Sequence, residues 1–319
     1  MRTITESQSN LIDAVIAEKY VGGLTTAILE KDIHVTEVLH ALSVIEHRHV
    51  SLVFCGGTSL SKAHGLIERM SEDVDLKVVL VENHGLSRTG IRHKLSELKE
   101  CVKATMVKLG FVEDPTGSLV RNEYRYVATS WLYESRYETD ISLRPHLSLE
   151  FTLRTPQFPT ASKSIAYLVD KLAGQNGASQ QSQCIAVEET LAEKVLSFLR
   201  RHAEHRSGNM RLDWDTALVR HIYDTYCIVQ ADPTMVDKAK ANFAALVGGD
   251  VEEFNRHEEF VRNPKQCLLG ALANAETEAQ TISEYQTRLM PLVYGNIKPD
   301  FNEAFRVFKT CSQILLDTL

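Results

Sequence analysis

Apolar positions recur with helical spacing over residues 9–48 and indicate two helices there. The polar triplet Glu30-Lys31-Asp32 lies between the two apolar stripes, and we expect it to break this segment and to start the second helix. Shorter apolar runs at residues 50–54 and 74–81 predict buried strands. Residues 56–69 between them predict a Gly-Gly turn that opens a helix. The chain is therefore expected to begin with helices and to continue into a sheet.

Mixed helical and strand patterns continue to about residue 154, and only helical spacing follows later. A helix is expected over residues 88–109, and residues 121–133 and 139–154 alternate like strands, with Pro145 as a break in the second. Residues 174–183 are small and polar and predict a linker or surface loop. The later segments with helical spacing are 187–206, 214–230, 234–246, 250–261, 266–286 and 299–317.

These patterns predict an α+β fold in two domains. Residues 1–172 are expected to form a mixed sheet flanked by helices, residues 173–185 a linker or surface loop, and residues 186–319 an all-helical domain. A length of 319 residues agrees with about two domains.

The charge balance limits how the chain can bind a polynucleotide. Lysine and arginine number 35 against 42 acidic residues, a net charge of −7, so no general basic field is available and nucleic acid would need a local basic patch. Two stretches offer such a patch. They are Arg200, Arg201, Arg206 and Arg211 in one, and Arg92, Lys94, Lys99, Lys103 and Lys108 in the other.

The cysteines and the apolar runs indicate a cytoplasmic protein. Six cysteines are scattered without a Cys-x-x-Cys pair, which is typical of reduced thiols. The N-terminus lacks an apolar signal core, and the longest apolar runs are too short to cross a bilayer. We therefore expect no membrane partner.

The segment from Phe54 to Leu76 combines residue types that suit phosphate chemistry. Gly56 and Gly57 let the backbone approach an anion, because no Cβ intervenes. Thr58 and Ser59 can cap the following helix, which would leave backbone amides to bind a phosphate at its positive end.

Two carboxylates follow on the second predicted strand. Side chains alternate along a strand, so Asp73 and Asp75 project from one face while Val74 packs behind them. Neighbouring carboxylates repel unless a cation lies between them, and hard oxygen ligands beside a phosphate site favour Mg²⁺. Two such ions stabilise the attacking and leaving oxygens of an in-line nucleotidyl transfer.

This segment resembles the DNA polymerase β-like nucleotidyltransferase superfamily, and most closely its AbiEii/AbiGii toxin family. Members carry Glu-Lys-Asp before a helix and then a stretch similar to FKGGTSLSK…IERFSEDIDL. Here Glu30-Lys31-Asp32 is followed by FCGGTSLSKAHGLIERMSEDVDL, in which Cys55 replaces the usual Lys and Met70 the usual Phe.

The resemblance implies further site residues. A third carboxylate is expected on a neighbouring strand; Glu150 is the first candidate and Asp140 the second. In the helical domain, Lys194 in a Glu-Lys sequence would bind the triphosphate, and Asp224, in a pattern similar to Arg-Asp-x-Tyr-Asp, would hold Lys194 or orient a base. The nucleotide-binding set is then Gly56, Gly57, Thr58, Ser59, Lys62 and Lys194.

The function implied is a Mg²⁺-dependent nucleotidyltransferase toxin. It would transfer NMP from an NTP to an acceptor hydroxyl with release of pyrophosphate, in a toxin–antitoxin or abortive-infection (phage-defence) system with a cognate antitoxin. Some relatives modify the acceptor end of tRNA, which makes tRNA the first expected acceptor. A protein or small-molecule acceptor remains open, as does a non-catalytic nucleotide-binding protein, although the intact Asp73 and Asp75 argue against the latter.

Overall fold

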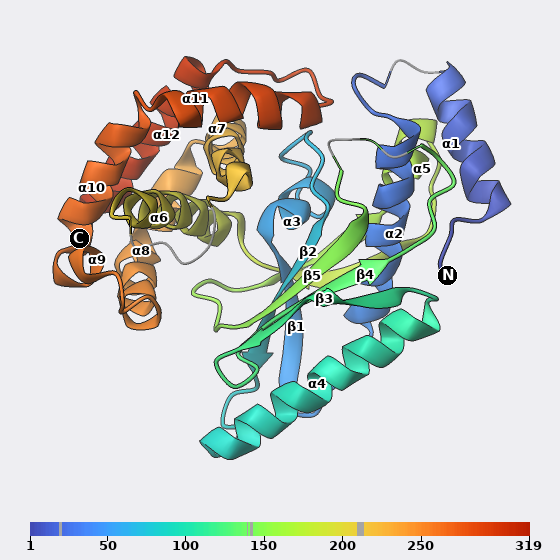
Figure 1. Cartoon of the computed structure of the whole chain (residues 1–319), viewed down its shortest axis with the longest axis horizontal. Coiled ribbons are helices and arrows are strands. Elements are labelled where there is room, and N and C mark those ends of the chain that lie inside the picture. The colour runs from blue at the N-terminus through green and yellow to red at the C-terminus, as the bar shows by residue number, and fades with distance from the viewer. Residues whose placement is uncertain (19–20, 139, 141–142, 209–213) are drawn as a thin grey trace. The chain divides into compact units, whose positions relative to one another are not determined.

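The computed structural model describes residues 1–18, 21–138, 140, 143–208 and 214–319, and the chain divides into two compact units (Figure 1). The first unit comprises residues 1–65 and 69–185, and the second comprises residues 66–68 and 186–319. The first is built around a mixed sheet and the second from helices, which confirms the α+β prediction.

The sheet of the first unit has seven strands in the order β3-β4-β5-β2-β1-β7-β6. Strand β2 lies at its centre, antiparallel to β1 and parallel to β5, and β7 runs parallel to β1 on the other side. The strands are β1 (Val50–Cys55), β2 (Asp73–Leu80), β3 (Val112–Arg121), β4 (Tyr126–Leu132), β5 (His146–Leu153), β6 (Ala161–Ala166) and β7 (Ser179–Cys184).

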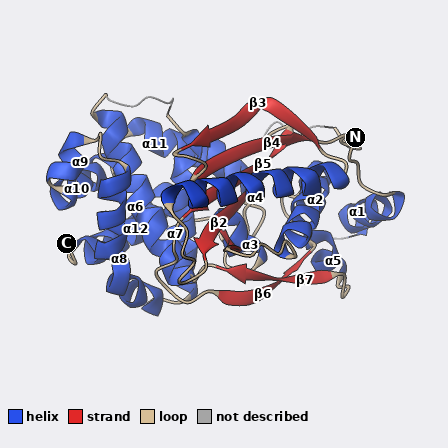
Figure 2. Cartoon of the chain, turned by 90° about the horizontal axis from the view of Figure 1, so that it is seen from below, coloured by secondary structure: helices blue, strands red, loops and turns tan. Residues whose placement is uncertain are grey.

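One face of this sheet carries the hydrophobic core. Val74, Leu149 and Trp131, from three adjacent strands, are almost fully buried in it. Helix α4 lies across this face (Figure 2) and contributes Leu95, Leu98, Val102 and Met106. The helices of this unit are α1 (Glu6–Glu18), α2 (Thr26–Ser43), α3 (Gly56–Lys62), α4 (Arg88–Lys108) and α5 (Leu168–Ala173).

The polar triplet does not break the helical segment, so that expectation was wrong. Helix α2 begins after its N-cap Thr25 and runs through Glu30-Lys31-Asp32, all of which are buried. Three consecutive charged residues suggest a break in the apolar helical pattern, because charged side chains normally face water. Each of these three side chains has a polar partner elsewhere in the unit, which allows the burial.

Three strands, β3, β6 and β7, were not predicted from the sequence patterns. Strand β3 contains Pro115 and Gly117, which weaken a strand signal, and it lies at the edge of the sheet with a bulge between Asp114 and Leu119. Strand β7 lies within the polar segment expected to be a loop, so that expectation was wrong for residues 179–184. Backbone pairing with β6 and β1 forms β7 without an apolar run. Helix α3 also ends at Lys62, earlier than expected.

The second unit is helical around a core that includes Phe198, Phe243 and Phe308. Residues 234–253 form one helix through Gly248, and the segment expected as one helix over 266–286 is divided among shorter elements. The helices are α6 (Val187–Arg206), α7 (Arg220–Ala231), α8 (Thr234–Glu253), α9 (Glu258–Arg262), α10 (Pro264–Ala275), α11 (Ala279–Glu284) and α12 (Phe301–Leu316), with short 3-10 or π turns at 216–219, 285–289 and 290–292. In the described part of the chain, no helix combines the length and the apolar character needed to cross a membrane.

Candidate active site

Three carboxylates share the face of the sheet that points away from α4. In the parallel pairing of β2 with β5, Asp75 lies opposite Glu150 and Asp73 lies opposite Ser148. Side chains at paired positions point to the same face, whereas Val74 and Leu149 between them point into the core. Asp73, Asp75 and Glu150 are each partly exposed, so a ligand can reach them.

Gly56 lies directly against one of these carboxylates. Its φ is +75°, and a Cβ added there would lie 2.0 Å from Oδ2 of Asp75. Both features require glycine, because other residues are strained at this φ and an added side chain would occupy the space of the carboxylate. The expected Gly-Gly turn therefore brings the backbone of α3 against Asp75.

Tyr126 of β4 interacts with two of the three carboxylates at this face. Its hydroxyl donates a hydrogen bond of 3.0 Å to Oε2 of Glu150. Burial raises the pKa of Tyr126, and the nearby charges of Glu150 and Asp75 raise it further. Two adjacent carboxylates that both act on one phenol form a set of hard oxygen donors, which fits Mg²⁺.

Arg144 supplies a positive charge beside the same carboxylates. Its Nη1 lies 2.5 Å from Oδ1 of Asp73, and its side chain is 42% exposed. The sequence patterns did not single out Arg144. Its position immediately before Pro145 and the strand of Glu150 was the available signal.

The buried triplet of α2 connects the segments around this site. Glu30 accepts hydrogen bonds from the Ser135 hydroxyl and from the backbone N–H of Arg136. Lys31 pairs with Glu72, the residue before Asp73, and its Nζ also donates to the carbonyl of Arg144 at 2.5 Å. Burial lowers the pKa of Lys31, against the effect of Glu72, which raises it.

Asp32, the third residue of the triplet, holds helix α3. Its Oδ1 lies 2.6 Å from Nζ of Lys62, and its Oδ2 accepts a hydrogen bond of 2.9 Å from the backbone N–H of Leu168. Lys62 also donates to the hydroxyl of Thr36. The cation expected to bind nucleotide is thus buried in contact with α2.

Thr58 and Ser59 do not cap α3, contrary to expectation. The N-cap is Cys55, without a side-chain hydrogen bond. The buried hydroxyl of Thr58 donates to the carbonyl of Asp73 at 2.5 Å, and the side chain of Ser59 is also buried. Among the expected phosphate-turn residues, Gly56 keeps a partly exposed backbone, whereas Gly57, Thr58 and Ser59 are buried.

The two candidates for a third carboxylate lie in different surroundings. Glu150 is in β5 opposite Asp75. Asp140 precedes β5, and its Oδ2 accepts a hydrogen bond of 3.0 Å from Thr25, the N-cap of α2. Thr139 and Ile141, which flank Asp140 in the expected strand, lie outside the described residues. The sheet register favours Glu150.

In the second unit, Lys194 and Asp224 form a buried ion pair. Nζ of Lys194 in α6 lies 2.6 Å from Oδ2 of Asp224 in α7, and both side chains are at least nine-tenths buried. The two residues that the resemblance assigns to the helical domain are therefore brought together, although they are 30 positions apart in the sequence.

The two basic stretches differ in how much charge they present. Arg200 is buried, lies 3.1 Å from Asp250 and covers the ring of Phe254, and Arg211 lies outside the described residues. On α4, three lysines pair with glutamates, yet the helix carries six basic residues against two acidic ones. Of the two stretches, helix α4 therefore presents more exposed basic side chains.

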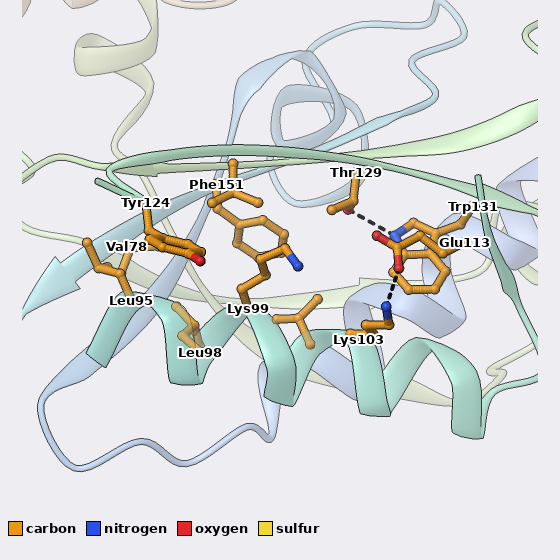
Figure 3. A pocket seen from close by; sticks show the side chains of 12 residues that line it. Val78, Leu95, Leu98, Lys99, Lys103, Glu113, Tyr124, Thr129, Trp131 and Phe151 are labelled. Carbon is orange, nitrogen blue, oxygen red and sulfur yellow. Dashed lines mark hydrogen bonds and ion pairs between the residues drawn. The ribbon is translucent and has the colours of Figure 1, made fainter. Parts of the chain in front are cut away.

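A narrow pocket between α4 and the sheet is not part of the carboxylate site. Figure 3 shows its mainly apolar lining, which includes Val78, Phe151 and Trp131. The Lys103–Glu113 ion pair of 2.7 Å lies at this pocket. These strand residues point to the core face, opposite to Asp75 and Glu150, so the pocket lacks the chemistry of the site.

The comparison with protein-family models agrees with the sequence motifs. The family model described as "Nucleotidyl transferase AbiEii toxin, Type IV TA system" matches residues 39–307. Among solved structures, the chain is similar to MenT4, a nucleotidyltransferase toxin from Mycobacterium tuberculosis H37Rv, with 17% identity, a TM-score of 0.39 and coverage of 84% of this chain and 99% of that one. The search of curated proteins found no match.

The contact between Gly56 and Asp75 predicts a large effect of one added methyl group. Gly56→Ala should destabilise the first unit more than Gly65→Ala. Both positions have a positive φ, so both variants share a backbone strain of roughly 1–2 kcal/mol. Only at position 56 does the new Cβ collide with a carboxylate; at Gly65 it meets no described atom within 4 Å. Thermal unfolding of the two variants measures the difference, and equal losses would contradict the contact.

Proposed function

The chain belongs to the AbiEii family, the nucleotidyl transferase toxins of type IV toxin–antitoxin systems, and from this premise we propose that it uses Mg²⁺ to transfer NMP from an NTP to a hydroxyl group of RNA. As a member it is an enzyme that uses an NTP and has an antitoxin partner. We further propose tRNA as the acceptor, the cytoplasm as the place of action and defence against phage as the setting.

The observation that carries this proposal is the register that sets Asp75 opposite Glu150, with Asp73 on the same face. In the proposal, these three carboxylates hold the metal ions, and Glu150 also helps to accept the proton of the attacking hydroxyl. The ions would neutralise charge on the α-phosphate and on the attacking and leaving oxygens. Tyr126 keeps Glu150 oriented through its hydrogen bond.

The backbone at Gly56 is the proposed phosphate contact of the turn. It is partly exposed and lies against Asp75, so a phosphate held there would be close to a metal-binding carboxylate. Thr58 and Lys62 support this turn from inside, because their side chains contact the carbonyl of Asp73 and the carboxylate of Asp32, and Ser59 is buried beside them.

The direct test is incubation of the purified protein with Mg²⁺ and each α-³²P-labelled NTP in turn. Three acceptor samples are compared: total RNA, purified tRNA, and the protein fraction of a lysate. Label on tRNA supports the proposal. Label only on protein or on small molecules contradicts tRNA as the acceptor. Absence of label with all four NTPs and all samples contradicts the transfer itself.

Loss of either central carboxylate should abolish transfer. Asp73→Asn and Asp75→Asn each remove a charge that the proposal gives to metal binding, and we expect at least about a thousandfold loss of turnover, by analogy with other strongly stabilising transition-state contacts. Glu82→Gln is the matched control, because Glu82 is exposed and follows the end of β2. Near-wild-type transfer by either aspartate variant, with unchanged thermal unfolding, would refute the assignment.

The choice between Glu150 and Asp140 gives a second comparison. Glu150→Gln should lower turnover by orders of magnitude, because it lies opposite Asp75. Asp140→Asn should have a mild effect, since its carboxylate accepts a hydrogen bond from Thr25, at the start of α2. Turnover is measured at saturating NTP and Mg²⁺ for both variants. The reverse ranking would move the third ligand to the segment before β5.

The Lys194–Asp224 ion pair should matter for nucleotide use. The resemblance assigns Lys194 to the triphosphate, and loss of a charge-assisted contact costs about 1.5–3 kcal/mol, roughly a ten- to hundredfold loss. Lys194→Ala and Asp224→Ala should each reduce kcat/KM for NTP to this extent, and Lys194→Arg should restore it only partly. The double variant should be little worse than either single variant. Rates are normalised to the folded fraction, and wild-type kinetics for Lys194→Ala would exclude the role.

A further inference from the structure

Arg144 is held by its main chain at two points, although its side chain is partly in solvent. Its backbone N–H donates to Oε2 of Glu72 at 3.0 Å, and its carbonyl accepts from Nζ of Lys31 at 2.5 Å. Lys31 and Glu72 are themselves paired, and both are buried. The buried Lys31–Glu72 ion pair therefore holds the peptide groups on both sides of the Arg144 Cα. The side chain of Arg144 extends from this fixed main chain.

The guanidinium of Arg144 and a metal ion bound at this site would compete for the same carboxylate oxygen. Nη1 of Arg144 lies 2.5 Å from Oδ1 of Asp73, and Asp73 shares its face with Asp75 and Glu150. Mg²⁺ binds carboxylate oxygens at about 2.0–2.1 Å and prefers a regular octahedral shell. A divalent cation at Asp73 would repel the guanidinium and take over the neutralisation of the carboxylate.

A guanidinium released beside metal-binding carboxylates has an obvious anionic partner. Its planar set of donors matches the oxygens of a phosphate, and its 42% exposure leaves it accessible. The negative charge available there when the enzyme turns over is the polyphosphate of the NTP. Backbone phosphate of the RNA acceptor has the same chemistry, so an experiment must separate the two.

We propose that Arg144 is a nucleotide-binding residue: it neutralises Asp73 while the site lacks metal and transfers to the NTP polyphosphate when the metal binds. The inference rests on the proposed function for the identity of the ligand. It assigns Lys31 and Glu72 a positioning role, because they hold the main chain of Arg144. No covalent step is involved; only the partner of the guanidinium changes.

The test measures metal binding and nucleotide binding separately in Arg144→Gln. Isothermal titration with Mn²⁺ alone should show tighter binding than wild type, by about threefold or more, because a competing charge has been removed. Titration with an α,β-methylene NTP analogue in Mg²⁺ should show about ten- to hundredfold weaker binding. Arg144→Lys should lie between, since a point charge replaces a planar fork.

The control is Arg48→Gln, an exposed arginine just before β1, at the end of that strand opposite to Cys55 and Gly56. It should change neither titration. Unchanged or weaker Mn²⁺ binding in Arg144→Gln, or unchanged binding of the analogue, would overturn the inference. A raised KM for RNA with unchanged analogue affinity would assign Arg144 to the acceptor instead, and would overturn it as well.

The outcomes also separate this inference from the proposed function. If wild-type protein transfers no nucleotide while both binding shifts occur, the transfer proposal fails and the role of Arg144 stands. If wild-type protein labels tRNA and neither shift occurs, the transfer proposal stands and the role of Arg144 fails.

Discussion

Three consecutive charges buried in one helix constrain the whole first unit. An ion buried without a partner costs several kcal/mol, so Glu30, Lys31 and Asp32 in α2 must each find a partner. Glu30 holds the segment at residues 135–136, Lys31 holds the residue before β2, and Asp32 holds the end of α3. These segments lead into the carboxylate strands or carry the glycine turn, so the positions of the carboxylates and of the turn depend on helix α2.

The three carboxylates are oriented by three different kinds of neighbour. Asp73 is held by a guanidinium, Glu150 by a phenol, and Asp75 by close packing against the backbone of Gly56. Contacts of this kind fix ligand geometry before a metal or substrate arrives. These neighbours also differ in charge, because Asp73 has a cationic partner whereas Glu150 has a neutral hydrogen-bond donor.

Local sequence patterns predicted some parts of this architecture correctly and missed others. The alternation around Asp73 and Asp75 defined their common face, because strand geometry is local, and the same holds for the long helix α4. The burial of Lys31 and the partner of Asp73 depend on contacts across 41 and 71 positions, which no periodicity reveals. Strand β7 was missed for a similar reason: its formation depends on pairing with β1 and β6 and not on its own polar sequence.

The bulge in β3 has a consequence for the behaviour of the protein in solution. Strand β3 is an edge of the sheet and exposes Val112, Leu119 and Val120, a composition that would otherwise invite another chain to add a strand. Pro115 lacks an N–H group to donate, and the shift of register between Asp114 and Leu119 interrupts the row of backbone groups that an incoming strand would follow. The irregularity that concealed this strand from the sequence patterns therefore protects the sheet from edge-to-edge aggregation.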